Sequence, residues 1–148
     1  MKKIFLVTLL LFSGVAVAGA NPVQLFEEKA SKNFTVCTAM ISINMMSNEA
    51  TKELRKYGDN SGKIKPYKCE VHKEEIKRLY KTAKQHLKDK SNKDGLGELK
   101  KFYAYWLTTM DTVLPDSYES NNAYERRITK RGTELQDKAN LLKIEADY

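Results

Sequence analysis

The first twenty residues carry one apolar run behind a short positive end. Two lysines precede the stretch 4–12, which is apolar except for one threonine, and small residues follow up to Ala20. This order is typical of a secretory signal peptide, and the run is too short to span a bilayer. We expect cleavage after Ala18 or Ala20 and export of residues 21–148 as one helical domain. The two-lysine start is typical of bacteria, so we expect the periplasm or the medium as destination.

Beyond this segment, apolar residues recur every three or four positions, which is the spacing of one helix face. The first face comprises Val23, Phe26, Ala30, Phe34, Cys37, Ile41 and Met45. Displaced by one residue, a second set continues it: Met46, Ala50, Leu54 and Tyr57. Ser47 and Asn48 lie where the apolar positions shift by one residue, and both residue types are preferred at helix N-caps. The pattern therefore predicts a helix that ends near Met46 and a short helix, about 49–57, that folds back.

Two further faces follow, separated by glycine-containing segments. The second face begins after Pro66, a residue that suits a first helical turn, and comprises Cys69, His72, Ile76, Leu79, Ala83 and Leu87. The third face ends before Pro115 and comprises Leu99, Phe102, Trp106, Met110 and Val113. Both segments are therefore predicted to be helices with one buried face.

The last face comprises Tyr124, Ile128, Leu135, Ala139, Leu142 and Ala146. Either Asp116, in a capping box with Glu119, or Ser117 caps this helix. Gly132 lies in its middle, where it permits a close helix contact or, at an exposed position, costs stability. No segment alternates apolar and polar residues with period two. We therefore predict an all-α fold, a small bundle of four helices, or five if the first is broken.

Cys37 and Cys69 are the only cysteines. In an exported protein, two cysteines most simply form one intramolecular disulfide bond. Their wide separation excludes a C-x-x-C redox motif and a haem attachment motif. A tight hairpin after an unbroken first helix places Cys69 near residue 55 rather than near Cys37. Either the connecting loop therefore runs back along the helix or the helix breaks, and the sequence pattern favours the break.

The chain is moderately basic, with a formal charge of +7 that falls to +5 without Lys2 and Lys3. One-sided basic positions on the second and fourth helices are Lys73, Lys77, Lys81, Lys84, Lys88, Arg126, Arg127, Lys130 and Arg131. These residues form either a solvated face, partly paired with glutamates at helix spacing, or a face that docks onto an acidic protein, lipid head groups or cell-wall polymers. Nucleic acid is not an expected partner, because no aromatic residues are interleaved with the basic ones.

The segment 102–107 carries aromatic residues on more than one helix face. Tyr103 and Tyr105 cannot both be buried beside Phe102 and Trp106. They lie either at the rim of the bundle or in a partner surface, because tyrosine is a common interface anchor. Beyond Pro115, Tyr118 and Tyr124 could extend such a surface.

We find no motif of a hydrolase, a phosphate-binding loop or a zinc site, and both thiols are assigned to the disulfide bond. A possible cofactor role for Met40, Met45 and Met46 with His72 is to hold haem or copper, and we favour the interpretation that these methionines fill the core. We therefore expect no metal, no cofactor and no enzymatic activity.

These patterns favour an exported, non-enzymatic helical protein that binds another protein in the bacterial envelope, for example as an inhibitor or an immunity factor. The alternative is a chaperone-like protein, or a binder of anionic envelope surfaces, that acts through the basic helix faces. No segment of residues 21–148 is apolar enough to span a membrane. The sequence does not decide the oligomeric state.

Overall fold

The computed structural model describes residues 20–56 and 68–148. Its helices are α1 (Pro22–Lys56), α2 (Lys73–Asp89), α3 (Lys93–Asp111) and α4 (Asn121–Ala146), and a short 3-10 helix, η1 (Cys69–His72), precedes α2. No strand occurs in these two ranges. The predicted small all-α bundle is confirmed, whereas the predicted signal peptide lies outside the described residues.

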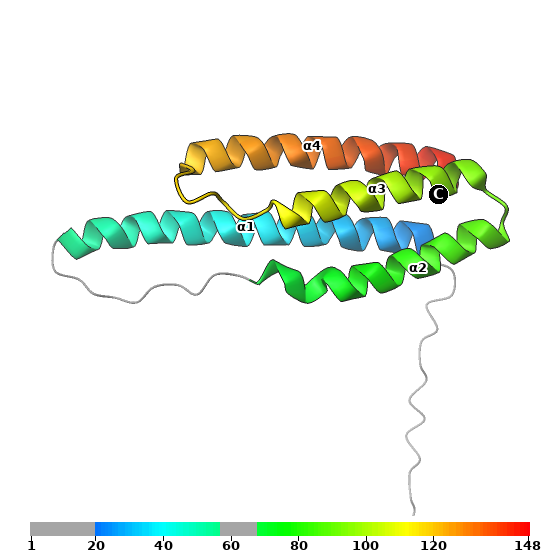
Figure 1. Ribbon diagram of the computed structural model, residues 1–148, viewed down its shortest axis with the longest axis horizontal. Helices are drawn as coiled ribbons and strands as arrows, with labels where there is room; N and C mark the ends of the chain where they lie inside the picture. The colour runs from blue at the N-terminus through cyan, green and yellow to red at the C-terminus, as the bar shows by residue number, and fades with distance from the viewer. Residues whose placement is uncertain (1–19, 57–67) are drawn as a thin grey trace, which may run out of the picture.

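The four helices alternate in direction (Figure 1). In that view α1 and α3 run from right to left, and α2 and α4 run from left to right. Helix α1 packs on α2 and α4, and α3 packs on the same two helices. This arrangement brings the start of α1, the turn from α2 to α3 and the C-terminus to one end of the bundle.

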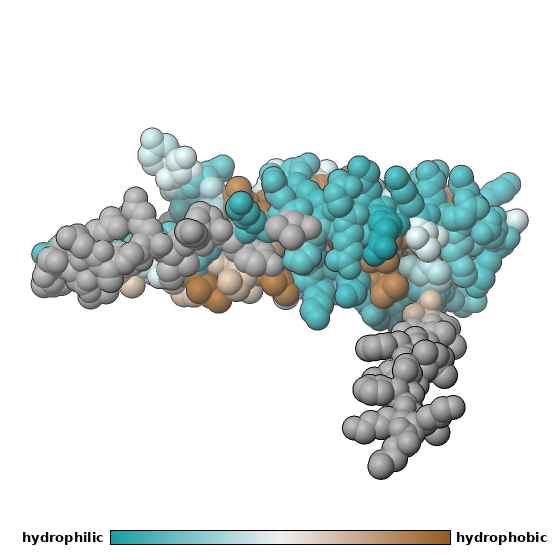
Figure 2. Space-filling view, turned by 90° about the horizontal axis from the view of Figure 1, so that it is seen from below, coloured by the Kyte–Doolittle hydropathy of each residue, from teal (hydrophilic) through white to brown (hydrophobic). Residues whose placement is uncertain are grey.

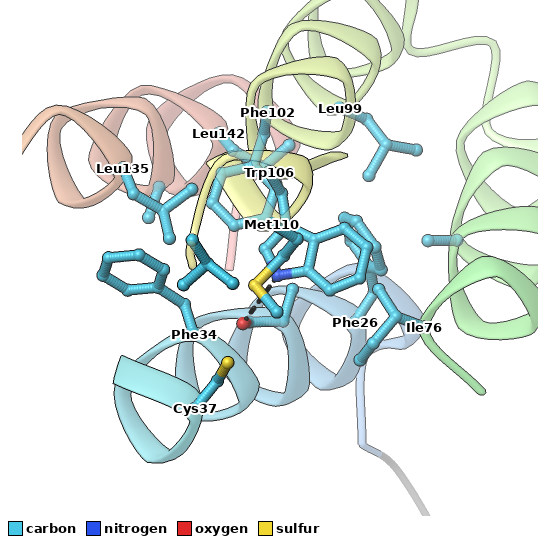
Figure 3. Close-up of a cluster of buried hydrophobic side chains, with 14 of the residues drawn as sticks. Phe26, Phe34, Cys37, Ile76, Leu99, Phe102, Trp106, Met110, Leu135 and Leu142 are labelled. Atoms are coloured by element: carbon cyan, nitrogen blue, oxygen red, sulfur yellow. Dashed lines mark hydrogen bonds between the residues drawn. The ribbon is translucent and has the colours of Figure 1, made fainter. Parts of the chain in front are cut away.

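Large aromatic side chains from α1 and α3 form the centre of the core (Figure 3). Phe26 and Phe102 meet edge to face with ring centroids 5.6 Å apart. The indole nitrogen of Trp106 donates a hydrogen bond of 3.0 Å to the carbonyl oxygen of Ala30 in the neighbouring helix. Because a buried indole N–H needs a partner, this bond fixes the position of α3 against α1.

The predicted break in the first helix is wrong, because α1 continues through Ser47 and Asn48 to Lys56. Cys37 and Cys69 nevertheless form the predicted disulfide bond, with Cα atoms 5.5 Å apart. Lys56 lies about 28 Å beyond Cys37 along the helix axis, and the residues between Lys56 and Cys69 can span about 40 Å. A connection of this length can reach Cys37 without a break in the helix.

The predicted N-cap of α4 is also wrong. Ser120 is the cap, and its hydroxyl accepts a hydrogen bond of 3.3 Å from the backbone N–H of Ala123. Asp116 and Glu119 do contact each other, because the Glu119 carboxylate accepts from the Asp116 backbone N–H at 3.3 Å. This contact closes a turn ahead of the helix instead of starting the helix. The Pro66 assigned to the start of the second helix lies outside the described residues.

Gly132 lies at a close contact between α4 and α1. A Cβ atom at this position would lie 3.3 Å from Cε1 of Phe34, tighter than most van der Waals contacts. The prediction that this glycine permits a close helix approach is therefore confirmed.

Candidate functional site

The tyrosines of α3 are engaged with neighbouring helices. Tyr103 stacks on Tyr80 of α2, with ring centroids 4.0 Å apart and an interplanar angle of 15°. It also stacks on Trp106, with a centroid distance of 6.2 Å. Burial raises the pKa of both Tyr80 and Tyr103. Tyr103 therefore belongs to the half-buried rim of the core.

Tyr105 joins α3 to α4 through polar contacts. Its hydroxyl donates a hydrogen bond to the Glu134 carboxylate and accepts one of 3.4 Å from Arg131. Burial raises the pKa of Tyr105, and the hydrogen bond from Tyr105 lowers the pKa of Glu134. The ammonium of Lys138 lies 5.1 Å from the centre of the Tyr105 ring. These contacts give Tyr105 a role in holding the two helices together.

The other two candidate tyrosines have opposite surroundings. Tyr124 is fully buried in the core, and this desolvation raises its pKa to about 12. Burial removes Tyr124 from the exposed surface that the sequence suggested, because its ring packs inward on the apolar face of α4. Tyr118 is fully exposed on the connection between α3 and α4. The four tyrosines therefore do not form one surface.

The basic positions of α2 divide into two groups. Lys73 forms an ion pair of 2.8 Å with Asp111 at the end of α3. The ammonium of Lys84 lies 6.0 Å from the ring centre of Tyr80. The remaining positions are exposed, and they are Lys77, Lys81 and Lys88. The basic face of α2 is therefore partly used to hold the bundle.

The basic positions of α4 divide in the same way. Arg126 and Lys130 are exposed and border a shallow polar hollow. Arg131 instead faces α3, where it contacts Tyr105 and lies 3.8 Å from the Glu134 carboxylate. Only part of the predicted basic cluster is therefore available to a partner.

Arg127 holds the connection between α3 and α4. Its guanidinium donates to both carboxylate oxygens of Glu119, at 2.8 and 2.7 Å. It also donates to the carbonyl oxygens of Thr112 and Leu114, at 2.6 and 3.1 Å. The hydrogen bonds between Arg127 and the Glu119 carboxylate lower the pKa of Glu119. Sequence reasoning placed Arg127 in a basic face, and no spacing in the sequence indicates this four-bond contact.

This connection presents an apolar surface, which we call the loop surface and define as Leu114 and Tyr118. Leu114 is 60% exposed and Tyr118 is fully exposed. Beside Leu114 lies a groove of about 480 Å³ that Cys69, Met110 and Val113 help to line. The groove is also lined by four charged residues, Lys68, Glu70, Lys73 and Asp111. The structure therefore places exposed Leu114 beside a groove of mixed lining, and exposed Tyr118 farther along the same connection.

A second apolar surface lies on α1 and was missed at the sequence level. We call it the outer stripe of α1 and define it by Val36, Ala39, Ile43, Met46 and Ala50. Val36, Ile43 and Met46 are 40 to 51% exposed. The prediction that Met40 and Met46 fill the core is therefore wrong, since Met40 is 36% exposed as well. Of the second apolar set, Met46 and Ala50 are exposed, and the side chains of Leu54 and Tyr57 lie outside the described residues. Figure 2 shows apolar side chains, in brown, along the part of the long axis that the middle of α1 occupies. The sequence signal that could have indicated this surface is a second set of apolar residues at helical spacing, on another face of the same helix.

Within residues 20–56 and 68–148, the acidic, histidine and cysteine side chains do not gather into a group of three or more able to hold a metal ion. Among these same residues, no helix has the length and apolar character needed to cross a membrane. No family model, curated protein or solved structure matches the chain.

Proposed function

We propose that this protein is a non-enzymatic binding protein of the bacterial envelope, and that the loop surface binds another protein. The observation that carries this proposal is the exposure of Leu114 and Tyr118 on a connection that Arg127 holds by four hydrogen bonds. An inhibitor or an immunity factor would bind in this way, through a small number of anchoring side chains on a stable scaffold.

A fixed loop is well suited to binding. Ordering a mobile loop opposes association, and a loop that is already held by Arg127 avoids much of that loss. Tyrosine is enriched among the residues that dominate interface energies, because its large ring also carries a polar hydroxyl. The groove beside Leu114 is lined largely by apolar atoms and has room for an apolar side chain of the partner.

The two carboxyl groups with lowered pKa values support a structural role for these side chains instead of a catalytic one. The lowered pKa values belong to Glu119 and Glu134. Glu119 is bound by Arg127, and Glu134 is bound by Tyr105. Both contacts join α3, α4 and their connection, so they explain the shifts without a reaction.

Affinity capture from the native host tests this proposal. The double variant Leu114→Ser, Tyr118→Ser removes the loop surface, and Leu141→Ser is a matched control because Leu141 is 49% exposed on α4. We expect one protein to be captured by the wild type and by the control and to be lost with the double variant. With that protein purified, Tyr118→Ala should weaken binding by about 2 kcal/mol in calorimetry. Equal capture by the double variant contradicts the proposal.

The second candidate function is a chaperone-like or anionic-surface binder that uses the exposed row Lys77, Lys81 and Lys88. These positions share one face of α2, at steps of four and seven residues, and remain exposed in the bundle. Suppression of client aggregation that weakens with salt and is lost after charge reversal of Lys77, Lys81 and Lys88 favours this function. Unchanged suppression after the reversal rejects it.

A further inference from the structure

The outer stripe of α1 is an apolar helix face whose five side chains are all exposed. On the opposite side of the same helix, Phe34, Cys37 and Ile41 are buried in the core. Ile43 and Met46 are about half exposed, at 49 and 51%. A helix with two apolar faces needs a second packing partner, and exposed apolar patches of this kind mark interaction sites.

The stripe has charged ends of opposite sign. Lys32 precedes it and Glu53 follows it, and both are exposed. From Lys32 to Glu53 the positions advance in alternating steps of four and three, which is the seam spacing of paired helices. They are Lys32, Val36, Ala39, Ile43, Met46, Ala50 and Glu53. The seam is therefore basic at one end, apolar in the middle and acidic at the other end.

Such a seam is complementary to itself when two copies lie antiparallel. With Ile43 at the centre, Lys32 of one copy lies opposite Glu53 of the other. Val36 then lies opposite Ala50, and Met46 lies opposite Ala39. Val36 and Met46 each meet an alanine, a large-to-small pattern that lets two helices approach closely, and Ile43 meets Ile43 of the other copy at the centre. A parallel pair would instead place lysine beside lysine and glutamate beside glutamate, which is unfavourable.

We infer that a second copy of this chain covers the outer stripe of α1, in an antiparallel homodimer centred on Ile43. The contact would extend from Lys32 to Glu53, about 32 Å along the helix axis. The stripe is held in place for this role, because Glu49, within the same stretch of α1, accepts a hydrogen bond of 2.6 Å from Asn121 at the start of α4. The inference does not depend on the loop surface.

The charges at the ends are available for contacts between copies. Glu53 forms an ion pair of 2.6 Å with Lys56 one turn away, but both side chains are about two-thirds exposed. An exposed pair of this kind contributes little and can be exchanged. Beside Lys32 and Val36, a groove of about 260 Å³ between α1 and α2 provides room for the end of the second copy.

Sedimentation velocity of the protein over a wide concentration range tests the dimer. We expect the wild type to be a dimer. The dissociation constant of the Ile43→Glu dimer should be higher by on the order of 100-fold or more, because two like charges then meet at the centre. Ile144→Glu is the matched control, since Ile144 is 71% exposed on α4. Circular dichroism checks that both variants fold. A wild-type monomer at all concentrations, or an Ile43→Glu variant that dimerises as the wild type does, overturns the inference.

Charge reversal tests the antiparallel register. Lys32→Glu and Glu53→Lys should each weaken the dimer roughly tenfold, because each change affects two ion pairs. The double variant should recover most of the wild-type affinity, since it restores opposite charges at both ends. A double variant that is weaker than either single variant overturns the antiparallel arrangement. Because these changes leave Leu114 and Tyr118 intact, failure of the dimer and failure of the proposed function are separate results.

Discussion

Two glycines in α3 allow a direct measurement of how closely α3 and α4 pack. A Cβ atom at Gly95 would lie 2.9 Å from the backbone oxygen of Glu145 and 3.1 Å from Cα of Ala146, whereas a Cβ at Gly97 would meet nothing within 4 Å. Asn92 adds to the same contact. Its side chain accepts from the Gly95 N–H and donates to the Glu145 oxygen, both at 2.8 Å. The substitution Gly95→Ala therefore pushes against backbone that Asn92 already holds.

The expected magnitude follows from two opposing effects. Replacing glycine by alanine in a helix stabilises by about 1 kcal/mol, and both positions receive this gain. Overpacking against atoms that cannot move away destabilises by about 1 to 3 kcal/mol, and only Gly95 suffers it. We therefore expect Gly97→Ala to raise the free energy of unfolding by about 1 kcal/mol and Gly95→Ala to fall about 1 to 3 kcal/mol below Gly97→Ala.

Urea unfolding measures both variants, with Trp106 fluorescence and far-UV circular dichroism as two probes of the same transition. Because the propensity gain is common to both, the difference between the variants isolates the cost of the contact with α4. If Gly95→Ala is as stable as Gly97→Ala, the close approach of α4 to Gly95 is refuted.

Three further predictions concern the core and its ionisable groups. Trp106→Phe should lower the free energy of unfolding by about 2 kcal/mol in urea titrations, since it removes ring volume and the bond to Ala30. An unchanged value contradicts this role. Arg127→Met should lower the free energy of unfolding by about 2 kcal/mol at pH 7. The pKa of Glu119 is lowered in the fold, so its stabilisation is present above the usual carboxyl pKa and disappears as pH falls through the folded value. The difference between Arg127→Met and wild type should therefore shrink in acid, and a constant difference argues against the pair. Burial raises the pKa of Tyr124 from 10.0 to about 12, so stability should fall as pH rises through this window, and less so in Tyr124→Phe. Tyrosinate absorbance that accounts for every tyrosine near pH 10 with the helices intact contradicts the burial of this hydroxyl.

Local spacing was enough to predict the helices and most of the core. The predicted faces of the last three helices supply buried residues such as Ile76, Phe102 and Leu142. A helix repeats every 3.6 residues, so one buried face leaves a regular trace in the sequence. The cysteine pairing was also accessible, because two cysteines allow only one intramolecular bond.

The length of α1 could not be derived in this way. Ser47 and Asn48 favour caps, but a preference of this kind is small and is overridden when neighbouring residues continue the helix. Likewise, Tyr118 and Tyr124 are the same residue type only six positions apart, yet one is fully exposed and the other fully buried. Their difference depends on where α4 begins.

The spacing of apolar residues is enough to identify which residues share a helix face, since that depends on positions within one segment. Which of these faces are covered depends on how the four helices pack together. Arg127 reaches Glu119 and the carbonyl oxygens of Thr112 and Leu114 because the chain turns between α3 and α4. Ile43 stays exposed because α2, α3 and α4 pack against the other side of α1. Burial depends on every neighbour at once, and a periodic pattern in one helix carries no information about neighbours that approach from elsewhere in the chain.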